Sequence, residues 1–219
     1  MIRCINLFVL CVFWALPVYG QQSLPPAVAD REEVFETPQG KQIMIKYHLP
    51  DHFDQQASYP VMITPGNFFL KNDPALHGWV MIEAFFGKTG FNNDDIRSVI
   101  NHLHELIDVR NDKLHMMSYS ANSGVMFRVA AAFPNDFAGL LTIPGHPRNR
   151  GQFEKLKDMR IRFIVGERDS YWLKEAQKAH DTFKNMGTDT ELEIVDNGGH
   201  VLEKLAGKPL YDRINRWFP

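Results

Sequence analysis

A serine stands where an apolar run of the sequence meets a helical pattern, and this position suits nucleophilic chemistry. The segment at 118–124 reads SYSANSG and leads into an amphipathic stretch at 122–133. At such a bend between strand and helix, the hydroxyl of Ser120 is exposed above the sheet edge, near the N–H groups of the helix N-terminus. Two other interpretations stay open: Ser120 merely caps the helix, or a neighbouring serine, Ser118 or Ser123, is the nucleophile.

A carboxylate and an imidazole follow two later apolar runs. IRFIV leads into the loop that holds Asp169, and ELEIV leads into the loop that holds His200. A serine hydroxyl is a good nucleophile only when a base within hydrogen-bond reach takes its proton. An imidazole does this near neutral pH, and a carboxylate holds the imidazole in the correct tautomer. The order Ser, Asp, His is typical of one kind of α/β sheet. We therefore predict a catalytic triad of Ser120, Asp169 and His200. The simpler alternatives are that Asp169 caps the following helix and that His200 is an ordinary loop histidine.

A loop after a third apolar run, YPVMIT, has the sequence PGNFF at 65–69. Its backbone N–H groups are candidates to bind the oxyanion that forms during attack on a carbonyl. We predict that the N–H groups of Asn67 and Ala121 form this pair. In known enzymes the loss of one such donor costs about 2.7–4 kcal/mol of transition-state stabilisation. The alternative is a plain Pro-Gly turn.

Side chains near the same loops are candidates for substrate contacts. Aromatic rings that could line an acyl or aryl pocket are Phe68, Phe69, Tyr171 and Trp172. Packing in the core or along a helix is the alternative for these rings. The segment at 144–150, PGHPRNR, brings Arg148 and Arg150 to the same edge, where either could receive an acidic group. A solvated loop is the simpler interpretation of that segment.

The elements that must position these residues alternate between strand and helix. Strands are predicted at 34–37, 41–49, 59–64, 79–86, 114–119, 137–143, 161–165 and 191–195, and helices at 94–107, 122–133, 170–186 and 208–218. The first two strands form a hairpin around Pro38-Gln39-Gly40, and Asn93 or Asp94 caps the first helix. This alternation predicts an α/β domain with a mostly parallel sheet and helices on both faces. Ligands bind such sheets at the carboxyl ends of the strands.

Composition and charge agree with one globular domain. The chain has 219 residues, of which 44% are hydrophobic and 23% charged, and its formal net charge is −2. Such a composition excludes a disordered, collagen-like or coiled-coil chain. Without a basic field, nothing in the sequence favours nucleic acid or anionic lipid as a partner. We predict a single domain over residues 34–219, with no insertion long enough for a separate lid domain.

The first residues are typical of an export signal. Residues 1–20 combine Arg3 with an uninterrupted apolar run at 7–16 and a cleavage site of small-residue type before Gln21. The run is shorter than the roughly 20 residues of a spanning helix. An N-terminal anchor or a buried strand is the alternative. We expect a cleavable signal peptide, a polar leader at 21–33, and a secreted or periplasmic mature protein with no membrane span.

Both cysteines of the sequence, Cys4 and Cys11, lie in the expected signal peptide. The mature protein would therefore contain no disulfide, no thiol nucleophile and no cysteine-ligated metal. The chemistry of the mature chain must then come from its other side chains.

With these residues assembled, the chain resembles an α/β-hydrolase, most similar to compact esterases related to polyhydroxybutyrate depolymerases and feruloyl esterases. The resemblance covers residues 41–218 and is best at 94–140; GERD at 166–169 and GGH at 198–200 resemble the acid and base loops of that family. It implies hydrolysis of a small-molecule ester through an acyl-enzyme, without cofactor or metal.

The sequence also departs from that family. Ser118 and Asn122 stand where it usually has glycines, Ser123 replaces another, and Pro65 replaces the usual histidine before the oxyanion glycine. These departures motivate a second hypothesis, an inactive hydrolase-fold envelope protein that binds a ligand or partner in the same cleft.

Overall fold

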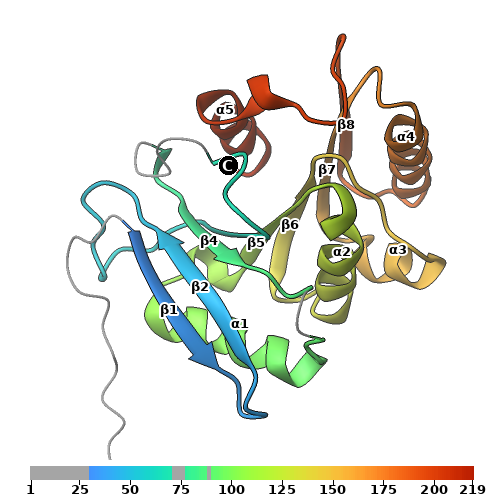
Figure 1. The fold of residues 1–219 in the computed structure, drawn as a ribbon. Coiled ribbons are helices and arrows are strands. Elements are labelled where there is room, and N and C mark those ends of the chain that lie inside the picture. The colour runs from blue at the N-terminus through green and yellow to red at the C-terminus, as the bar shows by residue number, and fades with distance from the viewer. Residues whose placement is uncertain (1–29, 71–76, 88–89) are drawn as a thin grey trace, which may run out of the picture.

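Eight strands form one sheet in the order β1-β2-β4-β3-β5-β6-β7-β8 in a computed structural model (Figure 1). The structure describes residues 30–70, 77–87 and 90–219. The strands are β1 (Asp30–Glu36), β2 (Gln42–His48), β3 (Val61–Thr64), β4 (Val80–Ala84), β5 (Leu114–Ser118), β6 (Phe137–Thr142), β7 (Arg160–Gly166) and β8 (Thr190–Val195). β2 pairs antiparallel with β1 and with β4, and all other neighbours pair parallel. The predicted hairpin and mostly parallel sheet are confirmed.

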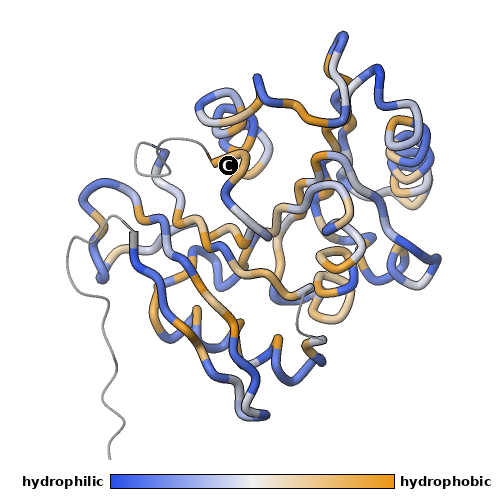
Figure 2. The backbone as a smooth tube through the Cα atoms, viewed as in Figure 1, coloured by the Kyte–Doolittle hydropathy of each residue, from blue (hydrophilic) through white to orange (hydrophobic). Residues whose placement is uncertain are grey.

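The strands differ in sequence because some are buried on both faces of the sheet and others on only one. β3 is buried at every residue and reads as a continuous apolar run, as expected for a strand covered on both faces. β2 alternates instead: Ile43, Ile45 and Tyr47 are buried, whereas Gln42, Met44 and Lys46 are exposed. Figure 2 shows the same contrast, with hydrophobic colours along the central strands and hydrophilic colours on the outer sides of the helices.

Helices cover both faces of the sheet and create two cores. The helices are α1 (Asn93–Leu106), α2 (Ser123–Ala132), α3 (Arg150–Leu156), α4 (Ser170–Asn185) and α5 (Lys208–Trp217). Side chains of the first four helices are buried in the larger core, and those of α5 in the smaller one. β5 contributes side chains to both cores: Met116 belongs to the larger core and Met117 to the smaller, because successive residues of a strand point to opposite faces of the sheet. None of the described helices combines the length and apolarity needed to cross a membrane.

The cap of α1 is Asn92, so the prediction of Asn93 or Asp94 is wrong by one or two residues. The Asn92 side chain accepts a hydrogen bond from the backbone N–H of Asp95 (2.9 Å), and the Asp95 carboxylate accepts one from the backbone N–H of Asn92 (2.9 Å). The buried Asp95 also accepts hydrogen bonds from Thr37 and Lys41 of the β-hairpin, each 2.7 Å long. Burial alone raises the pKa of Asp95, but these hydrogen bonds outweigh burial and lower it.

Two segments differ from their predicted form. β1 begins at Asp30, so it takes in the last four residues of the segment expected as a leader. Residues 150–156, which the sequence did not indicate as a helix, form α3. The Asn149 side chain caps α3 by accepting a hydrogen bond from the backbone N–H of Gln152 (3.1 Å). A helix of two turns is too short for its periodicity to stand out. The signal peptide expected at 1–20 and the leader at 21–29 lie outside the described residues.

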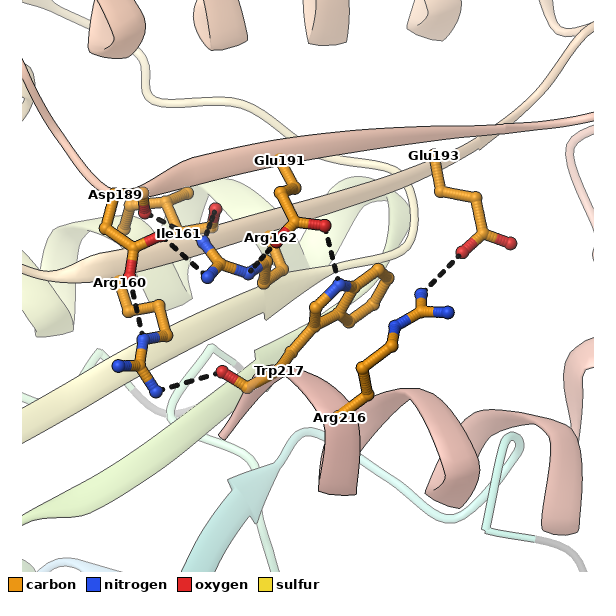
Figure 3. Close-up of polar contacts among 8 residues, drawn as sticks. All are labelled: Arg160, Ile161, Arg162, Asp189, Glu191, Glu193, Arg216 and Trp217. Carbon is orange, nitrogen blue, oxygen red and sulfur yellow. Dashed lines mark hydrogen bonds and ion pairs between the residues drawn. The ribbon is translucent and has the colours of Figure 1, made fainter. Parts of the chain in front are cut away.

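Ion pairs attach the edge strand β8 to its neighbours (Figure 3). Arg162 of β7 is almost fully buried, and its guanidinium donates to the Asp189 carboxylate (2.7 Å) just before β8. Glu191 of β8 accepts a hydrogen bond from the indole of Trp217 on α5 (3.0 Å), and Glu193 pairs with Arg216 (3.5 Å). These contacts hold the strand that leads directly to the loop of His200.

Candidate active site

Ser120 occupies a strained turn between β5 and α2. Its φ angle is +50°, in the left-handed region that residues other than glycine rarely adopt. The backbone N–H of Ser120 donates to the carbonyl of Pro144 in the loop after β6 (2.8 Å), which ties the turn to the neighbouring strand. Strain of this kind persists where the surroundings over-determine it, and it concentrates at functional sites.

The Ser120 side chain does not cap the helix. Its Oγ lies 2.8 Å from Nε2 of His200, which is 80 residues further along the chain. The two alternative nucleophiles, Ser118 and Ser123, have no exposed surface, so a substrate has no access to their hydroxyls. Of the three serines, only Ser120 can meet a substrate.

Asp169 completes a chain of side-chain hydrogen bonds. Its Oδ2 lies 2.6 Å from Nδ1 of His200. Because the carboxylate can only accept, Nδ1 carries the proton, and Nε2 is left as an acceptor facing the Ser120 hydroxyl. Asp169 stands at the N-cap position of α4 but makes no side-chain capping bond. The Asp169 side chain is 11% exposed and that of His200 is 41% exposed, so the base is accessible while its partner is sheltered.

The loops of Asp169 and His200 pack backbone against backbone. A Cβ on Gly166, at the end of β7, would lie 2.2 Å from the carbonyl oxygen of Gly199. The N–H of Arg168 donates to the carbonyl of Gly198 (2.8 Å). Only a glycine at 166 permits this approach, which sets the distance between the acid and the base.

The loop after β3 brings Asn67 to the same edge of the sheet. Neither the N–H of Asn67 nor that of Ala121 donates a hydrogen bond within the part of the chain that the structure describes. Asn67 is exposed, and its carbonyl accepts from the N–H of Leu70 (2.9 Å), which closes a tight turn. As far as the described residues go, both N–H groups that the sequence predicts as oxyanion donors are therefore without an acceptor in the protein.

Tyr119 supports this loop, a role that the sequence did not indicate. A Cβ on Gly66 would lie 2.7 Å from the Tyr119 hydroxyl oxygen, so the phenol lies directly against the Gly66 backbone. Burial and the nearby Glu83 carboxylate raise the pKa of Tyr119, so its hydroxyl stays protonated. Glu83 comes from β4 and is distant in sequence from this turn, so no local sequence pattern could have revealed its effect on Tyr119.

The four aromatic residues predicted near the pocket have different environments. The ring of Trp172 lies 5.9 Å from the His200 ring, centroid to centroid, at an interplanar angle of 31°. Phe68 and Tyr171 are 37% and 57% exposed. Phe69 is buried in the smaller core, so the packing alternative holds for that ring. Trp172 is thus the aromatic side chain that contacts the candidate base.

The charged residues at the site form no candidate metal centre. Among the described residues, no three His, Cys, Asp or Glu side chains lie in a group that could hold a metal ion. The arrangement of hydroxyl, imidazole and carboxylate is one that can activate a serine as a nucleophile toward an acyl carbonyl.

Comparison with known proteins establishes the fold. No protein-family model matches the sequence, and no curated protein matches it. Solved structures do match. A dienelactone hydrolase from Anabaena variabilis is 14% identical with a TM-score of 0.62; the match covers 87% of this chain and 98% of that one. An esterase from Rhizomucor miehei is 14% identical with a TM-score of 0.63, and 91% of this chain and 83% of that one are covered.

A thermostable esterase is also similar, at 14% identity and a TM-score of 0.62, and the match covers 87% of this chain. The chain spans only 60% of the length of that esterase. The strand order and these similarities together show that the chain has the α/β-hydrolase fold, as predicted.

Proposed function

We propose that the protein is a serine hydrolase that cleaves carboxylic esters through an acyl-enzyme. One observation carries the proposal: the continuous hydrogen-bonded chain from Ser120 through His200 to Asp169, with distances of 2.8 and 2.6 Å. The three residues come from three loops, each at the carboxyl end of a different strand, where ligands bind in sheets of this type.

In the first step, Oγ of Ser120 attacks the acyl carbon while its proton moves to Nε2 of His200. Asp169 accepts the hydrogen bond from Nδ1 and stabilises the imidazolium that forms. Negative charge develops on the former carbonyl oxygen. The N–H groups of Asn67 and Ala121 stabilise that charge by donating hydrogen bonds to the oxygen. In known enzymes each such donor contributes about 2.7–4 kcal/mol of transition-state stabilisation.

In the second step, the bond between the acyl carbon and the alcohol oxygen breaks, and Nε2 of His200 gives its proton to the departing oxygen. A water molecule then attacks the acyl-enzyme, with His200 again taking a proton. The bond to Ser120 Oγ breaks, the serine regains its proton, and the carboxylic acid leaves. The steps use the side chains named, the backbone N–H groups of Asn67 and Ala121, and water.

The backbone around the nucleophile agrees with this proposal despite the departures from the family pattern. Asn122 has φ −70° and ψ −19°, an ordinary helical conformation, so a glycine is not needed at that position. Ser118 and Ser123 are small enough to be buried beneath the turn. No observation favours the inactive binding protein over the hydrolase.

Covalent labelling tests the proposal directly. Purified protein treated with a fluorophosphonate and analysed by mass spectrometry should carry the label on Ser120. Labelling should disappear in Ser120→Ala and fall strongly in His200→Ala. Turnover of p-nitrophenyl acetate should fall to background in both variants.

Ser170→Ala is the matched control, because Ser170 is an exposed serine next to Asp169 with no role in the chain of hydrogen bonds. It should keep both labelling and turnover. A wild-type protein that is neither labelled nor faster than Ser120→Ala with p-nitrophenyl acetate contradicts the enzyme and supports the inactive binding protein.

We also propose that the enzyme acts after export. The support is the sequence of residues 1–20 alone, with its positive start and short apolar run. Expression of the full chain in a bacterial host should yield mature protein in the periplasm or medium, and N-terminal sequencing should begin at Gln21. An uncleaved Met1 terminus in the cytoplasm contradicts this part of the proposal.

A further inference from the structure

A cavity of about 560 Å³ lies beside the candidate active site, between the loop after β6, α3 and α4. It has the volume of a typical small-molecule pocket. Trp172 connects the two: its ring lies 5.6 Å from the ring of His146, which lines the cavity, and 5.9 Å from the ring of His200. The cavity therefore begins one aromatic ring away from the candidate base.

Arg148 lines the cavity and lies against the first turn of α2. A Cβ on Gly124 would lie 2.9 Å from Nε of Arg148 and 3.4 Å from Nη2, so the absence of a side chain at 124 makes room for the guanidinium. Gly124 follows Ser120 by four residues, about one helical turn. The backbone N–H of Arg148 donates to the buried side chain of Gln152 (2.6 Å), which fixes the loop.

Arg148 is an exposed residue, and its guanidinium is not neutralised by any residue that the structure describes. It makes no ion pair or side-chain hydrogen bond with any residue in the described ranges. Other arginines of the protein do form ion pairs: Arg97 pairs with Asp136, and Arg162 pairs with Asp189. A guanidinium is a planar fork whose N–H groups match the two oxygens of a carboxylate.

The other charges of the cavity leave an excess of positive charge. Its charged lining residues are Arg148, Arg150, Lys178, Glu154 and Glu175. Arg150 and Glu154 compensate each other at 3.8 Å. Arg148 and Lys178 then stand against the single carboxylate of Glu175.

His146 adds a second unused polar group. Its side chain is about nine-tenths buried, and its Nδ1 lies 2.9 Å from the carbonyl oxygen of Pro147, so Nδ1 carries the proton. Its Nε2 has no hydrogen-bond partner among the described residues. A buried nitrogen without a partner is uncommon, and here it belongs to a residue that lines the cavity.

We propose that this cavity binds a carboxylate carried by the ester substrate, and that Arg148 determines this specificity. The inference rests on the proposed function. The preferred substrates are then anionic esters: monoesters of dicarboxylic acids, or esters whose alcohol part bears a carboxylate. The guanidinium holds the carboxylate while the ester group reaches Ser120.

Two pairs of esters distinguish the two sources of the carboxylate. On the acyl side, mono-4-nitrophenyl glutarate is compared with neutral 4-nitrophenyl butyrate. On the alcohol side, 4-acetoxybenzoate is compared with neutral 4-acetoxybenzamide. For at least one pair, Arg148→Gln should lower kcat/KM of the anionic ester by about tenfold to hundredfold, the value of a hydrogen-bonded charge pair. The neutral ester should change less than twofold.

Two further variants separate specificity from general effects of charge and folding. Arg128→Gln removes the same charge from an exposed position on α2 outside the cavity. In each pair of esters, the ratio of kcat/KM for the anionic ester to kcat/KM for the neutral ester should stay as in the wild type. Gly124→Ala suits a helix but displaces the guanidinium, and should reduce the preference for the anion as Arg148→Gln does.

The inference is overturned if Arg148→Gln lowers kcat/KM equally for the anionic and neutral members of both pairs, or for neither. Hydrolysis of the neutral esters, with fluorophosphonate labelling of Ser120, would in that case leave the proposed function standing. No turnover of any of the four esters by the wild type overturns both.

Discussion

Gly166 and Gly199 approach each other so closely that a single methyl group on Gly166 would lie 2.2 Å from the carbonyl oxygen of Gly199. This contact joins the loop of the acid, after β7, to the loop of the base, after β8. The hydrogen bond from Nδ1 of His200 to the Asp169 carboxylate is short, at 2.6 Å, because these two loops can lie in direct contact.

Gly166→Ala should therefore separate Asp169 from His200. We expect a fall in kcat of about a hundredfold, similar to other misplacements of about 1 Å, and a loss of about 1–3 kcal/mol of stability from overpacking. Ester turnover and urea unfolding measure the two effects. Gly199→Ala is the control, because a Cβ there would meet no atom within 4 Å. Wild-type turnover in Gly166→Ala would show that the loop contact does not position the acid.

The contact between Gly66 and Tyr119 predicts a pair of variants that compensate each other. In Gly66→Ala the new Cβ would lie 2.7 Å from the Tyr119 hydroxyl oxygen but 3.9 Å from the ring carbon that bears it. The single variant should move the Asn67 N–H and lower kcat by about tenfold or more. Adding Tyr119→Phe removes the clashing oxygen and should bring kcat most of the way back to the wild-type value.

A double-mutant cycle on kcat measures this coupling. Purely additive losses in Gly66→Ala/Tyr119→Phe would mean that the hydroxyl does not fix the position of the loop.

The partly buried histidine of β5, His115, should make stability depend on pH. Burial lowers its pKa from 6.5 to about 4; a hydrogen bond with the Val61 backbone opposes this shift in part, and the nearby Arg160 adds to it to a smaller extent. Between these two values the unfolded chain binds a proton that the native protein does not, so the free energy of unfolding falls as pH drops from about 7 to 4. The full loss from this group is about 3 kcal/mol.

Urea unfolding at pH 7 and pH 4.5 measures the effect of His115. His115→Phe removes the titrating group and keeps a ring between Trp79 and Phe218, whose rings lie 5.1 and 5.0 Å from that of His115. Its stability should fall less over the same pH interval than that of the wild type. Parallel pH profiles for the two proteins would contradict the neutral state of His115 in the native protein.

The capping box of α1 predicts an effect on stability without an effect on chemistry. Asn92→Ala removes the acceptor for the Asp95 N–H and should cost about 1 kcal/mol. Asn93→Ala, one residue further, removes no cap and should be nearly neutral. Both should keep kcat, because α1 supplies none of the site residues. Thermal unfolding of the two variants decides between the cap observed here and the one that the sequence favoured.

Much of the site could be predicted because its signals are local. An apolar run that ends in a polar loop indicates a strand terminus, and in a parallel sheet such termini share one edge. Ser120, Asp169 and His200 each follow such a run, so their common location required no knowledge of packing. The fold class followed from the same alternation of strand and helix.

Other features depend on contacts between distant segments. Nothing near Asp169 in the sequence distinguishes a helix cap from a partner of His200; the carboxylate faces the imidazole because β7 and β8 are neighbours. The burial of Ser118 and Ser123, the support of Gly66 by Tyr119, and the position of Arg148 on Gly124 are likewise set by packing. The sequence by itself determined which residues stand at strand ends, because periodicity and turn chemistry act over a few residues. Only the tertiary structure decided which of those side chains meet, because that depends on the order and spacing of strands far apart in the chain.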